Sequence, residues 1–181
     1  MKSLMLAAAL TATAMVTHGE LFAFYPITAN DTNGYAQSTG ESQLYMDVTS
    51  VGIGQVSLVF TNAGPEESVI SSIYFDFAPE LGLSLEALNN GTGVEFQMGP
   101  VKPGNLPAGQ GLDNAFFSDL GVTAGNPKTR KGINPYEGLE LVMNYDDSYD
   151  LLSALGNEAL RVGLHVQDFA GGYSESFINA R

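Results

Sequence analysis

The stretch SVISSIYFDFA, residues 68–78, decides the fold, because apolar and polar side chains alternate along its second half. It is rich in β-branched and aromatic residues, which favour extended backbone. In a strand, Ile73, Phe75 and Phe77 lie on one face, while Tyr74 and Asp76 lie on the other. The stretch therefore predicts a β-strand with one buried face and one outward face.

Strand-like segments of this kind recur along the chain and are separated by turns that contain glycine, proline and asparagine. The nine segments are residues 21–25, 43–50, 54–62, 68–78, 93–98, 114–118, 138–144, 160–167 and 173–178. Many short strands joined by glycine-rich turns are typical of sandwiches. The sequence therefore predicts an all-β fold, an antiparallel β-sandwich of jelly-roll type with about nine strands.

One short helix is predicted within residues 146–160, where Asp147 or Ser148 can cap the first turn and Gly156 can end the last. Its apolar stripe consists of leucines: Leu151, Leu152 and Leu155. A weaker helical turn is predicted at residues 84–90. Residues 99–113 and 121–136 read as two long loops, because proline and glycine are frequent in both.

The charge balance excludes some classes of partner. The chain has 7 Lys and Arg against 20 Asp and Glu, a net charge of -13. Nucleic acid is therefore not an expected partner, because its phosphates require clustered cations. The chain has no cysteine, which excludes disulfides, thiol nucleophiles and cysteine-based zinc sites.

The N-terminal residues predict a signal peptide. Lys2 precedes residues 4–16, a run of 13 apolar and small residues that is too short to span a bilayer. Cleavage is expected after Ala14 or after Gly19, with Gly19 preferred because a strand-like segment follows it. We therefore expect a signal peptide at residues 1–19, a single sandwich domain at 20–181, no membrane span in the mature chain, and a secreted or periplasmic location.

Outward-facing polar side chains on two predicted strands are candidates for ligand binding: Tyr74 and Asp76 on one, His165 and Gln167 on the other. His165 is the one histidine that remains after cleavage at Gly19, so a histidine-based metal site would need carboxylates to complete it. A catalytic role for His165 is the less favoured hypothesis, since the chain has no G-x-S-x-G motif that would supply a serine nucleophile.

The acidic cluster Asp146, Asp147 and Asp150 is the candidate for a metal ion, with Ca²⁺ as the expected cation. The spacing of an EF-hand loop is absent, so a Ca²⁺ site would have to combine separate loops. Capping of the short helix explains the same residues without a metal, and no cofactor is expected otherwise.

Two further groups of residues bear on ligands. Lys128, Arg130 and Lys131 concentrate three of the seven basic residues in one segment, which either meets an acidic partner or is simply solvated. Exposed tyrosines can stack against sugar rings, although the chain has no tryptophan. The tyrosines considered are Tyr35, Tyr45, Tyr74, Tyr136 and Tyr149.

The order of several motifs resembles the passenger domains of exported bacterial PEP-CTERM sorting-signal proteins. The similarity extends over residues 55–179, and its most specific part is the closing motif. The matching residues are Phe60-Thr61-Asn62, Gly64-Pro65, Ile73-Tyr74-Phe75-Asp76, Pro103-Gly104-Asn105-Leu106-Pro107, Asn134-Pro135 and the closing motif from Arg161 to Asn179. The resemblance implies export and a β-rich role at the surface or in the matrix, and it carries over no catalytic residue.

The chain departs from this family pattern in two places. Tyr136 stands where the family has a glycine, in a turn that reads "NPGE". The Pro-Glu-Pro motif, the membrane-spanning segment and the basic cluster that usually follow the closing motif are not present after Arg181. The resemblance therefore implies a product that is released rather than anchored.

Together these observations predict an exported, non-enzymatic module of structural or adhesion type. Its expected setting is the cell surface or the extracellular matrix, with polysaccharide or other matrix proteins as partners. The alternative is a module that binds carbohydrate or a ligand held through calcium. A hydrolase is the third hypothesis.

Overall fold

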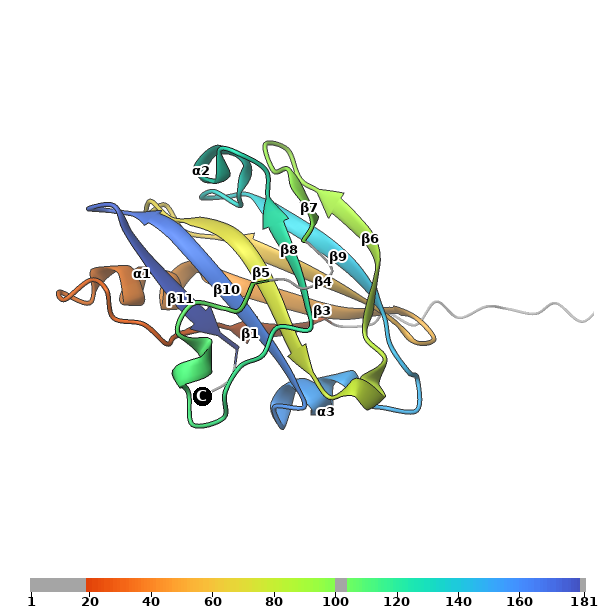
Figure 1. The fold of residues 1–181 in the computed structure, drawn as a ribbon. Helices are drawn as coiled ribbons and strands as arrows, with labels where there is room; N and C mark the ends of the chain where they lie inside the picture. The colour runs from red at the N-terminus through yellow and green to blue at the C-terminus, as the bar shows by residue number, and fades with distance from the viewer. Residues whose placement is uncertain (1–18, 100–103, 180–181) are drawn as a thin grey trace, which may run out of the picture.

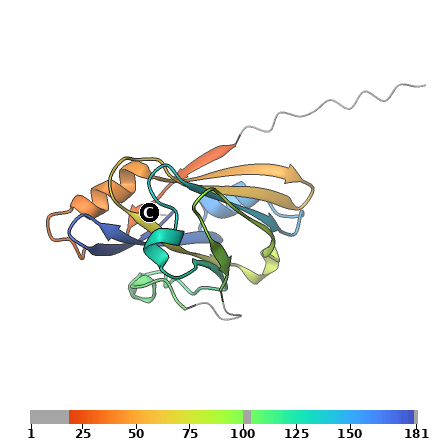
Figure 2. The same cartoon turned by 90° about the horizontal axis from the view of Figure 1, so that it is seen from above.

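A computed structural model describes residues 19–99 and 104–179 of the chain. These residues form two antiparallel sheets packed face to face (Figure 1), which confirms the predicted β-sandwich. Figure 2 shows the two layers from above, with β3 and β4 in one layer and β10 and β11 in the other. The predicted signal peptide lies outside the described residues, apart from Gly19.

The first sheet has the strand order β1-β3-β4-β9-β6, and the second has the order β2-β11-β10-β5-β8-β7. The strands of the first sheet are β1 (Glu20–Ala23), β3 (Leu44–Gly52), β4 (Gln55–Asn62), β9 (Gly138–Asn144) and β6 (Ser84–Asn90). Those of the second are β2 (Tyr25–Pro26), β11 (Tyr173–Ile178), β10 (Leu160–Phe169), β5 (Val69–Phe77), β8 (Leu120–Ala124) and β7 (Phe96–Met98). The described residues thus hold eleven strands, two more than predicted.

The core lies between the sheets and is filled by the faces that the alternation predicted. The fully buried side chains of four central strands meet there: Met46 of β3, Leu58 and Phe60 of β4, Ile73 and Phe75 of β5, and Val162 and Leu164 of β10. The rings of Phe60 and Phe75 join the two layers edge to face, with their centroids 6.4 Å apart. Each such side chain stabilises the fold by about 1.5–3 kcal/mol through burial.

A bulge interrupts β5 where it pairs with β10. His165 lies opposite Ser72, but the next residue of β10, Val166, lies opposite Ile70, so Ser71 has no partner in the ladder. Ile70 and Ile73 therefore both reach the core, although two residues separate them. The bulge places Ser71 and Ser72 side by side next to His165.

The helices lie at the ends of the sandwich rather than across its faces (Figure 1). They are α1 (Tyr35–Gln43), α2 (Lys128–Lys131) and α3 (Leu151–Gly156), and short 3₁₀ turns occur at Pro79–Leu81 and Gly109–Gly111. Within residues 19–99 and 104–179, none of the helices is long and apolar enough to cross a membrane.

The predicted short helix is α3, but its cap and its buried face differ from the prediction. Asp150 is the N-cap, and its side chain accepts hydrogen bonds from the backbone N–H groups of Leu152 and Ser153. Leu152 is 41% exposed, and Ala154 takes its place in the buried stripe. A helical period of 3.6 residues explains this result, because it places Ala154 beside Leu151 and turns Leu152 away.

The sequence did not predict α1, whose segment contains glycine, serine and threonine. Asp31 starts this helix from outside it, because its carboxylate accepts hydrogen bonds from the backbone N–H groups of Asn33 at 2.9 Å and Ala36 at 3.0 Å. These bonds lower the pKa of Asp31, the bond from Asn33 most. Gly40 packs directly on the ring of Phe177, so tertiary contact stabilises a segment of weak helix propensity.

Two predicted elements are wrong. Residues 84–90 form strand β6 and not a helical turn, because they pair with β9 along the edge of the first sheet. Residues 114–118 form no strand, since the carbonyls of Asn114 and Ala115 accept hydrogen bonds from the Arg161 side chain and join no ladder. The predicted long loop at residues 121–136 also contains most of β8 and all of α2.

The turn before β9 holds a tyrosine in left-handed backbone. Tyr136 has φ of 68° and is 75% exposed, so its ring gains little from burial. We expect Tyr136→Gly to raise the free energy of unfolding by about 0.5–1 kcal/mol, because relief of strain outweighs the added entropy of the unfolded glycine. The substitution keeps the backbone N–H at this position, which in Tyr136 donates to the Asn62 carbonyl at 2.6 Å.

Urea denaturation measures this change, and Tyr136→Ala is the matched control, since it removes the ring but keeps the Cβ. The alanine variant should show no gain. A glycine variant no more stable than the alanine variant would contradict the strain at this turn.

Candidate ligand-binding site

A hollow of about 180 Å³ opens on the outer face of the second sheet, between β5, β8 and α2. Its polar lining consists of Ser72 and Tyr74 from β5, Thr123 from β8 and Lys128 from α2. The remaining lining residues are small or apolar: Gly99, Gly104, Gly121 and Val122. We call this the outer-face hollow, and its volume suits one sugar-sized unit rather than a drug-sized ligand, which needs about 300–1,000 Å³.

The strand pairing explains why these side chains converge. Ser72 lies opposite Thr123, and Tyr74 lies opposite Gly121, in the antiparallel pair of β5 and β8. Residues two apart on one strand share a face, so Ser72 and Tyr74 both point outward. Gly121 contributes no side chain to the hollow, so Tyr74 is the one side chain of this residue pair that lines it.

Hydrogen bonds fix the polar groups of the outer-face hollow. The Ser72 hydroxyl donates to the Ser71 carbonyl at 2.8 Å and lies 3.0 Å from the Thr123 hydroxyl, and the Lys128 ammonium donates to it at 3.4 Å. Because the one proton of the Ser72 hydroxyl is directed to the Ser71 carbonyl, the Thr123 hydroxyl donates either to Ser72 or to the Ser71 carbonyl, 3.4 Å away. The lone pairs of Thr123 and two N–H groups of Lys128 are left for a ligand.

Of the four predicted ligand-binding residues, the structure brings two to this region. Tyr74 lines the outer-face hollow, and His165 lies beside Ser72 in the pairing of β10 with β5. Asp76 lies elsewhere on the face and forms an ion pair with Arg161. Gln167 lies opposite Val69, the first residue of β5.

The charge of the site comes from Lys128 and not from the imidazole. His165 is half-buried, and burial, together with the positive charge of Lys128, lowers its pKa below the usual 6.5. The ring is therefore neutral at pH 7 and offers one donor and one acceptor.

The Ser71 and His165 pair does not form an activated nucleophile at the hollow. The Ser71 hydroxyl lies 3.5 Å from Nδ1 of His165, but it donates to the backbone carbonyl of His165 at 3.0 Å. Ser71 is fully buried, and no carboxyl group of the described residues is hydrogen-bonded to the ring. A triad requires an exposed hydroxyl and a base oriented by a third group.

The predicted metal ligands serve local structure. Asp146 accepts hydrogen bonds from the backbone N–H of Ser148 at 3.0 Å and from its hydroxyl at 2.7 Å, and Asp150 caps α3. Hydrogen bonds lower the pKa of both aspartates, mainly that from the Ser148 hydroxyl for Asp146 and that from the Ser153 hydroxyl for Asp150. The described part of the chain brings no three His, Cys, Asp or Glu side chains into a group that could hold a metal.

Among the five tyrosines considered for sugar stacking, Tyr74 is the one that lines the outer-face hollow. The hydroxyl of Tyr35 donates to Glu66, which raises the pKa of Tyr35, and the hydroxyl of Tyr45 donates to the Ser42 carbonyl. Tyr136 and Tyr149 are exposed away from this hollow.

Sequence reasoning missed Ser72 and Thr123 as site residues and treated Lys128 only as part of a basic segment. One signal was available: in SVISSIYFDFA the apolar positions Ile70 and Ile73 are three apart, which breaks the period of two. Such a break indicates a bulge, which changes the face of the strand on which the residues after it lie.

No protein-family model, no curated protein and no solved structure matches this chain. The resemblance to PEP-CTERM passenger domains therefore stays a prediction. The function has to be inferred from the outer-face hollow and the residues around it.

Proposed function

We propose that this chain is an exported, non-enzymatic module of adhesion type that holds an extracellular polysaccharide through the outer-face hollow. The observation that carries the proposal is the convergence of Ser72, Thr123, Lys128 and Tyr74 on one small open space. Sugars are bound by hydrogen bonds to their hydroxyls and by an aromatic ring against their C–H faces, and the hollow offers both.

Export is supported by the signal-peptide pattern of residues 1–19 and by the resemblance to exported passenger domains. A surface or matrix setting fits a chain of net charge -13, which stays soluble at high local concentration. Binding without catalysis is supported by the Ser71 hydroxyl, which is fully buried and donates to the backbone carbonyl of His165 rather than to its ring.

Titration calorimetry of the purified protein with a panel of oligosaccharides tests this proposal. We expect at least one to bind, and Thr123→Val to weaken it about 3–10-fold, because one hydrogen bond is worth about 0.5–1.5 kcal/mol. Thr61→Val is the matched control, since Thr61 lies on β4 of the other sheet. If no oligosaccharide bound, or if both variants weakened binding equally, the proposal would be wrong.

A further inference from the structure

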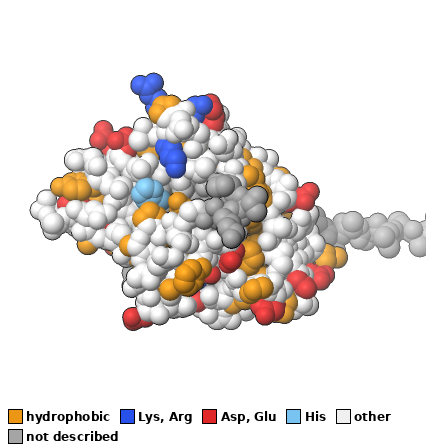
Figure 3. All heavy atoms as spheres, in the orientation of Figure 1, with side chains coloured by type: hydrophobic (Ala, Val, Ile, Leu, Met, Phe, Trp, Pro, Cys, Tyr) orange, Lys and Arg blue, Asp and Glu red, His pale blue; other side chains and the backbone are white. Residues whose placement is uncertain are grey.

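The described cations are distributed very unevenly. Four Lys and Arg residues lie in the described part of the chain, and one of them, Arg161, is buried against Asp76. The other three belong to α2: Lys128, Arg130 and Lys131. In the view of Figure 3, the blue Lys and Arg side chains gather at the upper edge of the molecule, while the red acidic side chains are spread over the rest of the visible surface.

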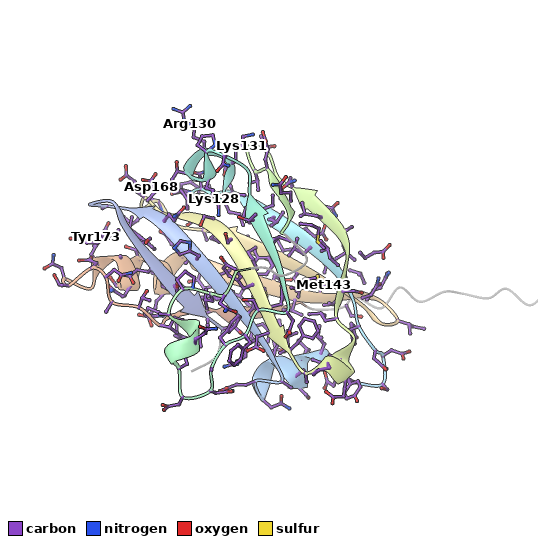
Figure 4. The ribbon with its side chains drawn as sticks, in the orientation of Figure 1. Lys128, Arg130, Lys131, Met143, Asp168 and Tyr173 are labelled. Carbon is purple, nitrogen blue, oxygen red and sulfur yellow. The ribbon has the colours of Figure 1, made fainter. Side chains whose placement is uncertain are left out.

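Two of these three cations are available to a ligand. Lys131 forms an ion pair with Glu95, whereas Lys128 and Arg130 form no ion pair with any residue that the structure describes. In Figure 4, Lys128 lies on the side of α2 next to the sheet, and Arg130 projects away from the sandwich. The ammonium of Lys128 therefore lines the outer-face hollow and has no ion-pair partner among the described residues.

We infer that the outer-face hollow takes an acidic sugar, with the Lys128 ammonium holding the carboxylate of a uronic acid unit. This inference rests on the proposed function and names its ligand class. Tyr74 covers one side of the sugar ring, the Thr123 hydroxyl accepts from a ring hydroxyl, and Arg130 adds positive charge where the polymer leaves the hollow.

The net charge of -13 does not prevent this binding at physiological salt. The Debye length there is about 8 Å, so acidic groups elsewhere on the molecule are largely screened from the hollow. A charge-assisted hydrogen bond at the contact itself is about twice as strong as a neutral one. The local contact therefore outweighs the distant repulsion, and the acidic surface elsewhere restricts an acidic polymer to the α2 edge.

His165 supplies an independent readout. The positive charge of Lys128 contributes to its lowered pKa, after burial. A carboxylate bound to Lys128 offsets that charge, so the pKa of His165 should rise when the acidic sugar binds. NMR titration of the imidazole, with and without ligand, reports this change without relying on affinity.

The test compares trigalacturonate with galactotriose, which has a hydroxymethyl group in place of each carboxylate. We expect trigalacturonate to bind at least tenfold more tightly and to raise the pKa of His165. Lys128→Met should reduce its affinity to that of galactotriose, and Lys128→Arg should restore most of it. Lys131→Met is the matched control, because Glu95 already engages that ammonium, and it should change the affinity less than threefold.

The outcomes separate the two proposals. Equal binding of both trisaccharides, or an unchanged affinity in Lys128→Met, would overturn the acidic-sugar inference and leave polysaccharide binding standing. Failure of the whole oligosaccharide panel, both trisaccharides included, would overturn the proposed function as well. Thermal denaturation of each variant confirms that it is folded, since all three substitutions are at the surface.

Discussion

An Arg161→Met variant is expected to lose about 3–5 kcal/mol of its free energy of unfolding, because removing one partner of a buried ion pair leaves the other uncompensated. The Arg161 side chain is 6% exposed and pairs with Asp76, whose side chain is 17% exposed. It also donates to the carbonyls of Asn114 at 2.6 Å and Ala115 at 2.7 Å. Its guanidinium lies 5.4 Å from the centroid of the Phe116 ring.

The consequence reaches beyond the ion pair, because Arg161 fastens residues 104–119 to the outer face. Leu106 and Phe116 of this segment form a second small apolar cluster with Ile178. Gly163 makes their close approach possible, since a Cβ there would lie 2.7 Å from a methyl group of Leu106. In the variant, the backbone N–H groups of residues 104–119 should therefore exchange with solvent faster than those of β5.

Urea denaturation measures the loss of stability, and two further variants serve as comparisons. Arg161→Lys keeps the charge but not the planar fork, so an intermediate loss is expected. Lys131→Met removes an exposed ion pair, which is worth about 0–1 kcal/mol. A loss in Arg161→Met as small as that in Lys131→Met would show that Arg161 does not hold the segment.

The contrast between Asp76 and Tyr74 shows what the sequence could predict. Alternation placed both residues on the outward face of their strand, and the structure bears this out. Their different roles depend on partners far along the chain: Arg161 for Asp76, and Gly121 with Lys128 around the space next to Tyr74. Local periodicity contains no information about such pairings, so it predicted the face correctly but not which residues share a site.

The errors in secondary structure have the same origin. Residues 84–90 have helical propensity, yet an open edge of β9 accepts them as a strand. Residues 114–118 have strand character, yet their carbonyls are occupied by the side chain of Arg161, about 45 residues away. In both segments a long-range contact outweighed a local preference worth only tenths of a kcal/mol per residue.

The residues of the closing motif have structural roles as well. The Asn179 side chain accepts a hydrogen bond from the Val162 N–H at 2.6 Å, and the backbone N–H of Asn179 donates to the Val162 carbonyl at 3.1 Å. Arg161 fastens the segment above the sheet. The closing motif therefore supplies contacts that hold β10, β11 and the covering segment together. The outer-face hollow, in contrast, is built mainly from β5, β8 and α2.

Glu175, in the same motif, holds the N-terminal segment on β11, and Glu175→Ala should lower the free energy of unfolding by about 3 kcal/mol. The side chain is almost completely buried. One of its oxygens accepts hydrogen bonds from the backbone N–H groups of Asn30 at 2.8 Å and Asp31 at 2.9 Å, and from the Gln37 amide at 3.0 Å. The other accepts from the Thr28 hydroxyl. Alanine leaves these donors without their partner, at about 1–3 kcal/mol for each one that water cannot reach.

Glu175→Gln is the decisive comparison, and we expect it to cost less than about 1 kcal/mol. A glutamine carbonyl can accept the same three N–H bonds. Its amide can donate to the Thr28 hydroxyl, which already accepts from the Ser176 N–H at 2.8 Å and still has a second lone pair. Hydrogen exchange should show that α1 loses protection in the alanine variant and keeps it in the glutamine variant, because Asp31 starts α1 and its N–H is held by Glu175. Equal losses in the two variants would mean that the negative charge of Glu175, and not its geometry as an acceptor, holds the segment in place.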